Sequence, residues 1–327
     1  MTVILVLAAA VWMPAADGRD YLVFDVVGDS ISAGVNPECG TYGWVHMLFG
    51  QTNCGQALNS QTLTNLWPGI TAYNSAVSGS TARQWAWAAP SYLQTVSNHH
   101  PDLVVVFIGG NDGLGYACDG FYSPQEQGEF RTNLTLILQK LHSFCPAPEI
   151  IVANYYDLFD GFSSSLPPLY AAYTNLSAAV REGNRMIEEI AFSNGCFHVD
   201  VHSEFMHHCY GAELGDTNHL SPAYVRTPLS AFDIHPVTAG HNTIRELIFE
   251  RLTELHRIPE FTAASAGIST ISLQWRSGIG QSYVVERSTN LTGAFIGVAT
   301  NIATPPANVF NEDIGEINRA FYRIRVE

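Results

Sequence analysis

The stretch that decides the fold is Phe24-Asp25-Val26-Val27-Gly28-Asp29-Ser30, an apolar strand that stops abruptly at Gly-Asp-Ser. A serine just past a buried strand, on a turn loosened by glycine, projects its hydroxyl from the carboxyl edge of a sheet, where α/β folds bind their ligands. Ser30 is therefore a candidate nucleophile. Taken alone, the tripeptide favours an ordinary turn, because Gly, Asp and Ser are all turn formers.

Around this stretch, short apolar runs alternate with longer helical patterns. Strands are expected at residues 21–27, 72–76, 103–108, 149–153 and 197–201. Helices are expected at residues 125–142, 169–193 and 239–257, where apolar residues recur at three- and four-residue spacing. This alternation predicts an α/β domain with a parallel sheet covered by helices on both faces, and a cleft beyond the carboxyl ends of the strands.

The pattern changes after Ile258 and Pro259. Short β-branched or aromatic runs without helices follow at residues 268–275, 282–287, 297–302 and 320–326. Such runs predict a small antiparallel β-sandwich. The stretches 283–291 and 321–326 resemble a small fibronectin-like module of exported bacterial proteins, which implies either a stabilising cap or a weak carbohydrate or surface contact.

Length and charge narrow the function classes. A chain of 327 residues is long enough for one large domain and a smaller one. The fifteen basic and thirty acidic residues give a net charge of −15, so a nucleic-acid backbone would be repelled. Residues 1–17 are expected to be a signal peptide because an apolar stretch is followed by small residues, although no basic residue precedes it. The expected domains are then 18–257 and 258–327, in a secreted or periplasmic protein.

The six cysteines also favour export. They fall in three close pairs along the chain: Cys39 with Cys54, Cys118 with Cys145, and Cys196 with Cys209. We expect disulfides in these pairs, each holding a long loop on the face that carries Ser30. The alternative is six reduced thiols in the core. No Cys-x-x-Cys spacing occurs, which makes structural zinc and a thioredoxin-like site poor interpretations.

A serine nucleophile needs a base, a group that orients the base, and donors aimed at the developing oxyanion. Gly79 has no side chain to keep its backbone N–H from a substrate oxygen. Asn111 follows the strand at 103–108 and carries a neutral amide that donates at any working pH. His235 stands directly before the last predicted helix of the domain, where it can reach back toward Ser30. Each motif by itself would read as a turn or a surface residue.

The motifs together are Gly28-Asp29-Ser30, Gly79 in Asn-x-Ala-x-Ser-Gly-x-Thr, Gly109-x-Asn111-Asp112 and Asp233-x-His235-Pro236. In this order they resemble the SGNH hydrolases, also called GDSL esterases, over residues 21–257. The resemblance implies a three-layer flavodoxin-like fold with Ser30 as nucleophile and His235 as base. It also implies an oxyanion hole made of the Ser30 N–H, the Gly79 N–H and the Asn111 side chain. The family needs no metal or organic cofactor, so none is expected.

One motif departs from the family pattern. The family usually places its acid three residues before the histidine, where this chain has Phe232, and Asp233 stands only two before. Residues two apart in an extended loop point to the same side, so Asp233 can still orient His235 through Nδ1. A backbone carbonyl is the alternative. The distinction matters because loss of the acid from such a triad can lower turnover by about 10⁴.

Possible metal ligands cluster at His198, Asp200, His202, His207 and His208. Alternation along a strand followed by a loop accounts for most of this cluster, and no clear ligand set emerges.

The sequence therefore predicts a secreted serine ester hydrolase acting through an acyl-enzyme on Ser30. Lipid-like or short-chain acyl esters are the first expectation, because the cysteine spacing and the loop at 154–159 resemble secreted lipase-like members. An acetylated polysaccharide is the alternative, suggested by the β module. A catalytically impaired glycan- or lipid-binding protein of the same fold is a third, motivated by the displaced acid. We expect no nucleic-acid partner and no stable membrane insertion.

Overall fold

The chain forms two compact units, one over Tyr21–Phe249 and one that includes Glu250–Glu327. The computed structural model describes residues 21–51, 62–118, 123–159, 176–210, 220–225, 233–257, 261–266, 270–276, 282–290, 293–302, 307–313 and 320–326. The predicted signal peptide at 1–17, Cys54 and Phe232 lie outside the described residues.

The first unit is built on a five-stranded parallel sheet, as predicted. Its strands are β1 (Val23–Gly28), β2 (Thr71–Ala72), β3 (Leu103–Phe107), β4 (Glu149–Ala153) and β5 (Phe197–Val199). Their order is β2-β1-β3-β4-β5, and every pair is parallel. This is the flavodoxin-like order, in which strand order reverses between β1 and β3. All five residues of β3 are buried, which explains its unbroken run of valines.

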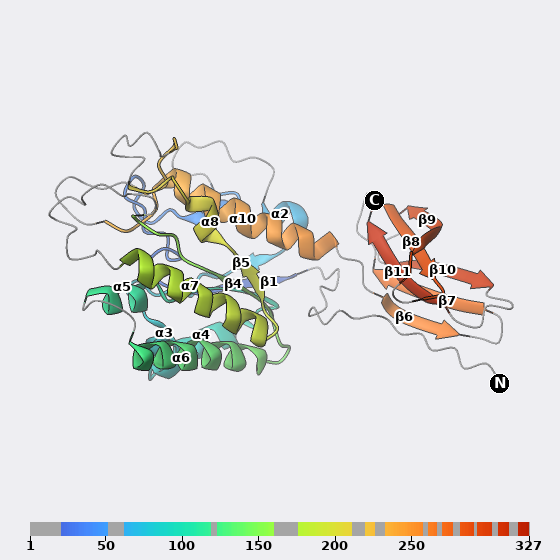
Figure 1. Ribbon diagram of the computed structural model, residues 1–327, viewed down its shortest axis with the longest axis horizontal. Coiled ribbons are helices and arrows are strands. Elements are labelled where there is room, and N and C mark those ends of the chain that lie inside the picture. Colours follow the sequence, from blue (N-terminus) through green and yellow to red (C-terminus); the bar gives the residue numbers. More distant parts are fainter. Residues whose placement is uncertain are drawn as a thin grey trace. The chain divides into compact units, whose positions relative to one another are not determined.

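Helices cover both faces of this sheet. They are α1 (Trp44–Leu48), α2 (Leu63–Leu66), α3 (Ala82–Trp87), α4 (Tyr92–His99), α5 (Gly110–Cys118), α6 (Pro124–His142), α7 (Leu176–Ser193), α8 (Val201–Phe205) and α10 (Thr238–Arg257). Figure 1 shows the sheet between α10 with α2 and α8 on one side and α3 to α7 on the other. The predicted three-layer α/β architecture is confirmed.

Two local features of this unit differ from the prediction. Strand β2 covers only Thr71–Ala72, because beyond Tyr73 the chain leaves the ladder and the Ser75 side chain and N–H bind the buried Asp25 carboxylate instead. Helix α5 was not predicted, since glycines at three of its nine positions favour a loop in the sequence. Helix α5 begins shortly after β3, at the carboxyl edge of the sheet.

The second unit consists of two three-stranded antiparallel sheets. One has the order β10-β7-β6, from β6 (Phe261–Ala266), β7 (Thr270–Arg276) and β10 (Ala307–Asp313). The other has the order β11-β8-β9, from β8 (Ser282–Ser288), β9 (Ile296–Ile302) and β11 (Phe321–Val326). Trp275 of β7 packs in one core with Tyr283 of β8 and Tyr322 of β11, so the two sheets face each other as predicted.

Two of the three expected disulfides are wrong, because Cys145, Cys196 and Cys209 are thiols. Cys196 precedes β5 at the amino edge of the sheet, whereas Cys209 follows α8 beyond the carboxyl edge. Cys145 likewise precedes β4, and α6, which has 19 residues and is therefore roughly 28 Å long, separates it from Cys118. These pairs are close in sequence but lie at opposite ends of strands or helices.

The remaining cysteine pair stays a prediction. Cys39 is disulfide-bonded, but its expected partner Cys54 lies outside the described residues. Burial in the sheet region raises the pKa of the Cys196 thiol to about 12, so this thiol is unreactive at neutral pH.

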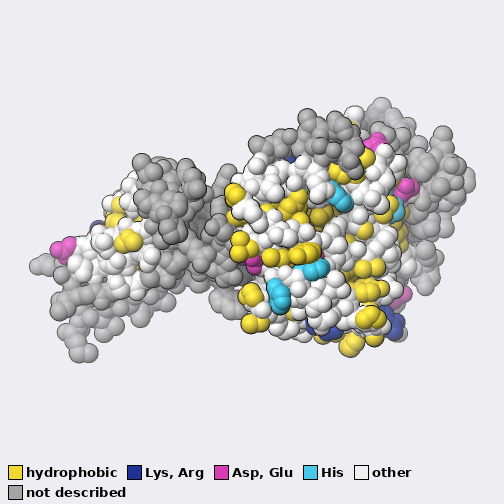
Figure 2. Space-filling model, turned by 180° about the vertical axis from the view of Figure 1, so that it is seen from behind, with side chains coloured by type: hydrophobic (Ala, Val, Ile, Leu, Met, Phe, Trp, Pro, Cys, Tyr) yellow, Lys and Arg dark blue, Asp and Glu magenta, His cyan; other side chains and the backbone are white. Residues whose placement is uncertain are grey.

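The surface agrees with the charge of the chain. On the face in Figure 2, hydrophobic side chains form small separate patches, and Lys and Arg cover only small areas. Among the described residues, no helix combines the length and apolar character needed to cross a membrane.

Candidate active site

Ser30 stands at the end of β1 on a tight turn. The Asp29 carboxylate accepts a hydrogen bond from the Ile31 N–H at 3.0 Å, and the Ala33 N–H donates to the Asp29 carbonyl at 2.9 Å. Gly28 is required just before this turn, because a Cβ there would lie 2.5 Å from the Ser32 hydroxyl. The turn places Ser30 at the carboxyl edge of the sheet, as the sequence predicted.

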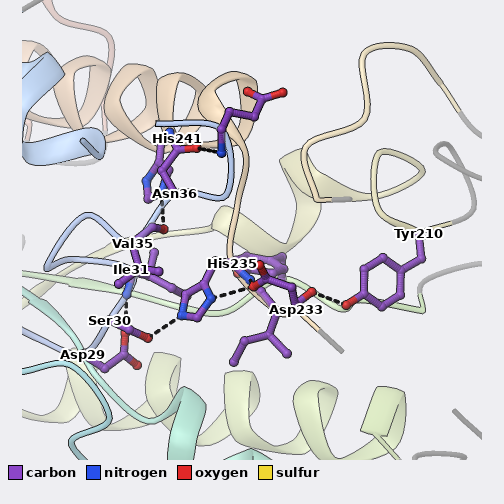
Figure 3. A network of polar contacts seen from close by, with 12 residues as sticks. Asp29, Ser30, Ile31, Val35, Asn36, Tyr210, Asp233, His235 and His241 are labelled. Atoms are coloured by element: carbon purple, nitrogen blue, oxygen red, sulfur yellow. Dashed lines mark hydrogen bonds and ion pairs between the residues drawn. The ribbon is translucent and has the colours of Figure 1, made fainter. Parts of the chain in front are cut away.

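His235 lies between Ser30 and Asp233 (Figure 3). Its Nε2 is 2.9 Å from Ser30 Oγ, and its Nδ1 is 2.7 Å from Asp233 Oδ1. A carboxylate can only accept, so Nδ1 carries the hydrogen and Nε2 is left to accept from the serine hydroxyl. This is the arrangement that a general base needs.

The short spacing of Asp233 and His235 is explained by an Asx turn. Asp233 Oδ1 accepts the His235 backbone N–H at 3.0 Å as well as the ring Nδ1–H at 2.7 Å. An Asx turn binds the N–H two residues ahead, so an acid two positions before the histidine can hold its backbone and its ring at once. The carboxylate, rather than a backbone carbonyl, orients this imidazole.

Two tyrosines hold the loop that carries His235: Tyr156, from the loop at 154–159, and Tyr210, which the sequence did not single out. The Tyr210 hydroxyl donates to the Asp233 carbonyl, and the Tyr156 hydroxyl donates to the next carbonyl, that of Ile234. Figure 3 shows Tyr210 beyond Asp233, on the side away from His235. Tyr156 and Tyr210 are both buried, so these donors fix the loop from the protein interior.

The loop after Ser30 is joined to the start of α10. Val35 donates its N–H to the Ser30 carbonyl at 2.9 Å, and its carbonyl accepts from His241 Nε2 at 3.0 Å. Glu38 accepts the Thr238 N–H at 3.0 Å. Burial lowers the pKa of His241 to about 4, so the ring is neutral at pH 7. These contacts tie Ser30 to the segment that directly follows His235.

The three oxyanion donors expected from the sequence each have a hydrogen left to donate. In the described part of the chain, the backbone N–H groups of Ser30 and Gly79 have no acceptor. Asn111 Nδ2 uses one hydrogen on the Ser80 carbonyl at 2.9 Å, which leaves its second hydrogen to donate. Gly79 has φ +79°, and a Cβ there would meet nothing within 4 Å, so its backbone faces open space.

Contacts between neighbouring strands hold the Gly79 turn in place. The Val77 N–H and the Ser80 hydroxyl both donate to the Gly28 carbonyl, at 2.9 and 3.1 Å. Asp112 Oδ2 accepts the Ala82 N–H at 2.8 Å and so caps α3 directly after the turn. The sequence indicated Asp112 only as a neighbour of Asn111, and its capping role depends on tertiary contact.

A second buried acid lies under the nucleophile. Asp29 Oδ2 is 2.7 Å from the Tyr155 hydroxyl, which also lies 3.0 Å from the Phe107 carbonyl. Burial raises the pKa of Asp29 to about 6, although the contacts with Tyr155 and His235 oppose this shift. Burial likewise raises the pKa of Asp112 to about 6. The site therefore holds two carboxyl groups that titrate well above the usual range.

A cavity of about 60 Å³ adjoins Ser30. Most of its lining is apolar or glycine, and the residues include Ile31, Gly109, Gly110, Gly113, Leu114, Phe130, Tyr155, Tyr156, Leu158, Val180, Gly183, Ile187 and Ile234. The loop at 154–159 contributes three of them, Tyr155, Tyr156 and Leu158. Ser30 thus lies beside a small apolar space.

The possible metal ligands of the sequence do not form a metal site in the described residues. No group of three or more His, Cys, Asp or Glu side chains there could hold an ion. Asp200 caps α8 by accepting from Ser203, and His208 Nδ1 contacts the Pro222 carbonyl at 2.8 Å. His198 and His202 border a separate polar depression near α7.

Solved structures share the fold of the first unit. An extracellular lipase from Streptomyces rimosus is 18% identical, with a TM-score of 0.50 over 70% of this chain and 98% of its own. The acetyl xylan esterase AlAXEase is 14% identical, with a TM-score of 0.50 over 70% of this chain and 99% of its own. Comparison with curated proteins gives no match.

The sheet order, the serine at the end of β1 and its histidine define the class as an ester hydrolase on a flavodoxin-like sheet. A model of the GDSL-like lipase/acylhydrolase family matches residues 26–242, which is more than half of the chain. The protein therefore belongs to the GDSL-like lipase/acylhydrolase family, and the resemblance seen in the sequence motifs is confirmed.

Proposed function

We propose that the protein is a secreted serine esterase that cleaves lipid-like or short-chain acyl esters through an acyl-enzyme on Ser30. The observation that carries the proposal is the line of contacts from Ser30 Oγ to His235 Nε2 at 2.9 Å and from His235 Nδ1 to Asp233 at 2.7 Å. A serine is a weak nucleophile at its ordinary pKa, and a base at hydrogen-bond distance activates it.

In the first step, Ser30 Oγ attacks the ester carbonyl carbon while its proton passes to His235 Nε2. The carbonyl π bond opens and leaves a negative charge on oxygen, which the Ser30 N–H, the Gly79 N–H and the Asn111 amide would stabilise. When the carbonyl re-forms, the bond to the alcohol oxygen breaks, and the alcohol departs with the proton from His235. The product is an acyl-enzyme on Ser30.

Water completes the cycle by the same route. His235 Nε2 takes a proton from water as the water oxygen attacks the acyl-enzyme, and it returns this proton to Ser30 Oγ when the carboxylic acid leaves. The Asp233 side chain stabilises the imidazolium present in both steps. None of these steps requires a metal or organic cofactor.

The apolar cavity beside Ser30 supports an acyl group rather than a polar ligand at this position. These contacts do not identify the alcohol portion of the ester, so an acetylated polysaccharide is tested alongside simple esters.

Export is supported by the apolar stretch near the start of the sequence and by the disulfide-bonded Cys39. For the second unit we propose an accessory role, as a stabilising cap or a weak surface contact.

The test is turnover of p-nitrophenyl esters and release of acetate from acetyl-xylan by purified protein. We expect p-nitrophenyl ester turnover that Ser30→Ala and His235→Ala each lower by about 10⁴ or more. Ser91→Ala is the matched control, because this serine precedes α4 and makes no side-chain cap hydrogen bond. Wild-type turnover by Ser30→Ala would contradict the proposal. Acetate release without p-nitrophenyl ester turnover would favour the polysaccharide alternative.

A further inference from the structure

The cavity beside Ser30 is a slot between two helices. Gly113 and Leu114 line it from α5, and Val180, Gly183 and Ile187 line it from α7. Glycine in a helix interior is less favourable than alanine, by about 1 kcal/mol. Both helices nevertheless have a glycine inside their span at the slot, where any side chain would take up part of the space.

Phe130 of α6 also lines the slot. Phe130 is fully buried, and a Cβ added to Gly109 would lie 2.9 Å from its ring and 3.9 Å from Ile187 Cδ1. Gly109, with φ +128°, follows β3 two residues before Asn111. The backbone near the candidate oxyanion donors is thus in contact with a ring that lines the slot.

Apart from the candidate oxyanion donors of Ser30 and Asn111, the main polar groups that line the slot have partners. Asn184 Oδ1 accepts the Tyr155 N–H at 2.9 Å, and Asn184 Nδ2 donates to the Tyr155 carbonyl at 2.6 Å. The Tyr155 hydroxyl contacts the Asp29 carboxyl group at 2.7 Å. A ligand in the slot would therefore gain little from polar groups of its own, and an apolar chain fits it best.

The volume of the slot limits the length of that chain. A water molecule needs about 10–15 Å³ by the same measure, so a cavity of about 60 Å³ holds four to six water-sized groups. A methylene group is about as large as a water molecule. We propose that the slot binds the acyl chain of the ester, that it takes an unbranched chain of four to six carbons, and that Gly113 and Gly183 set its width while Phe130 sets its depth.

This inference rests on the proposed ester hydrolysis and is tested with p-nitrophenyl esters from acetate to palmitate. Each methylene buried in the slot raises kcat/KM by about fourfold, so hexanoate exceeds acetate by about 200-fold and laurate gains nothing further. Gly113→Val and Gly183→Val should remove most of the advantage of hexanoate over acetate. Phe130→Leu, which shortens a side chain that lines the slot, should shift the optimum toward octanoate.

The matched control is Gly115→Val in the same helix, because a Cβ at Gly115 meets nothing within 4 Å. It should keep the wild-type chain-length profile, and thermal unfolding of all variants shows which of them fold. A wild-type optimum at acetate or laurate would overturn the inference, as would folded Gly113→Val and Gly183→Val variants with the wild-type profile. These results leave ester hydrolysis intact, whereas absence of turnover on every ester contradicts the proposed function itself.

Discussion

Replacement of Asp233 by Asn tests the contact between the Asp233 carboxylate and His235 Nδ1, which the family's usual spacing did not predict. Asn keeps an oxygen that can accept from the His235 N–H and ring, so the Asx turn is preserved and only the charge is lost. The charges of Asp233 and an imidazolium at His235 lie roughly 4 Å apart, where their attraction is about 4 kcal/mol at an effective dielectric constant of 20. The two side chains are 27% and 21% exposed, which weakens this attraction.

We therefore expect Asp233→Asn to lower kcat by about 10² to 10³, less than the 10⁴ seen when a fully buried acid is lost. The assay is kcat for p-nitrophenyl butyrate at pH 8. Asp200→Asn is the control, because Asp200 also accepts bonds at a helix start beyond the carboxyl edge, from Ser203 and Asn154, and makes no hydrogen bond or ion pair with His235. If Asp233→Asn keeps kcat within about twofold of the wild type, the carboxylate does not assist the histidine and the reasoning is refuted.

Three further results are expected. Asn111→Ala should lower kcat by about 10² to 10³ with a small change in KM, and an unchanged kcat would exclude Asn111 as an oxyanion donor. Folding lowers the pKa of His241 from 6.5 to about 4, so the stability it contributes is present above pH 6.5 and about 3 kcal/mol is lost as pH falls to 4. Urea unfolding of His241→Gln should lack this loss; an identical pH dependence in both proteins would argue against a neutral buried ring. Alkylation of denatured, unreduced protein should label Cys145, Cys196 and Cys209. Absence of label on these three would instead support the disulfides expected from the sequence.

Most of the first unit could be predicted from sequence because its central strands are buried on both faces. The valines of β3 form an unbroken run, and the residues of β1 before Gly28 are apolar except for Asp25, which indicates a parallel sheet. Strands β6 and β10 were missed for the opposite reason. Four of the six residues of β6 are Ala or Ser, and β10 contains Asn, Glu and Asp, so neither has a clear β pattern.

The site was predictable where a residue closely follows its own strand, as Ser30 and Asn111 do, or stands in a recognisable motif, as Gly79 does. The site was less predictable where the orientation of a side chain depends on residues that are distant in the sequence. The orientation of Asp233 requires an Asx turn held by Tyr156 and Tyr210, which are 77 and 23 residues away in sequence. Two of the three expected cysteine pairs failed because closeness in sequence does not tell which edge of a sheet each residue occupies.

The central claim is that His235 activates Ser30 as a nucleophile. Reaction with an organophosphonate ester, followed by intact-mass and peptide mass spectrometry, tests it directly. The account predicts one adduct per chain on the peptide that contains Ser30, none in Ser30→Ala, and labelling of His235→Ala that is slower by about 10³ or more. An adduct on another residue, or equal labelling rates in the wild type and His235→Ala, would contradict it.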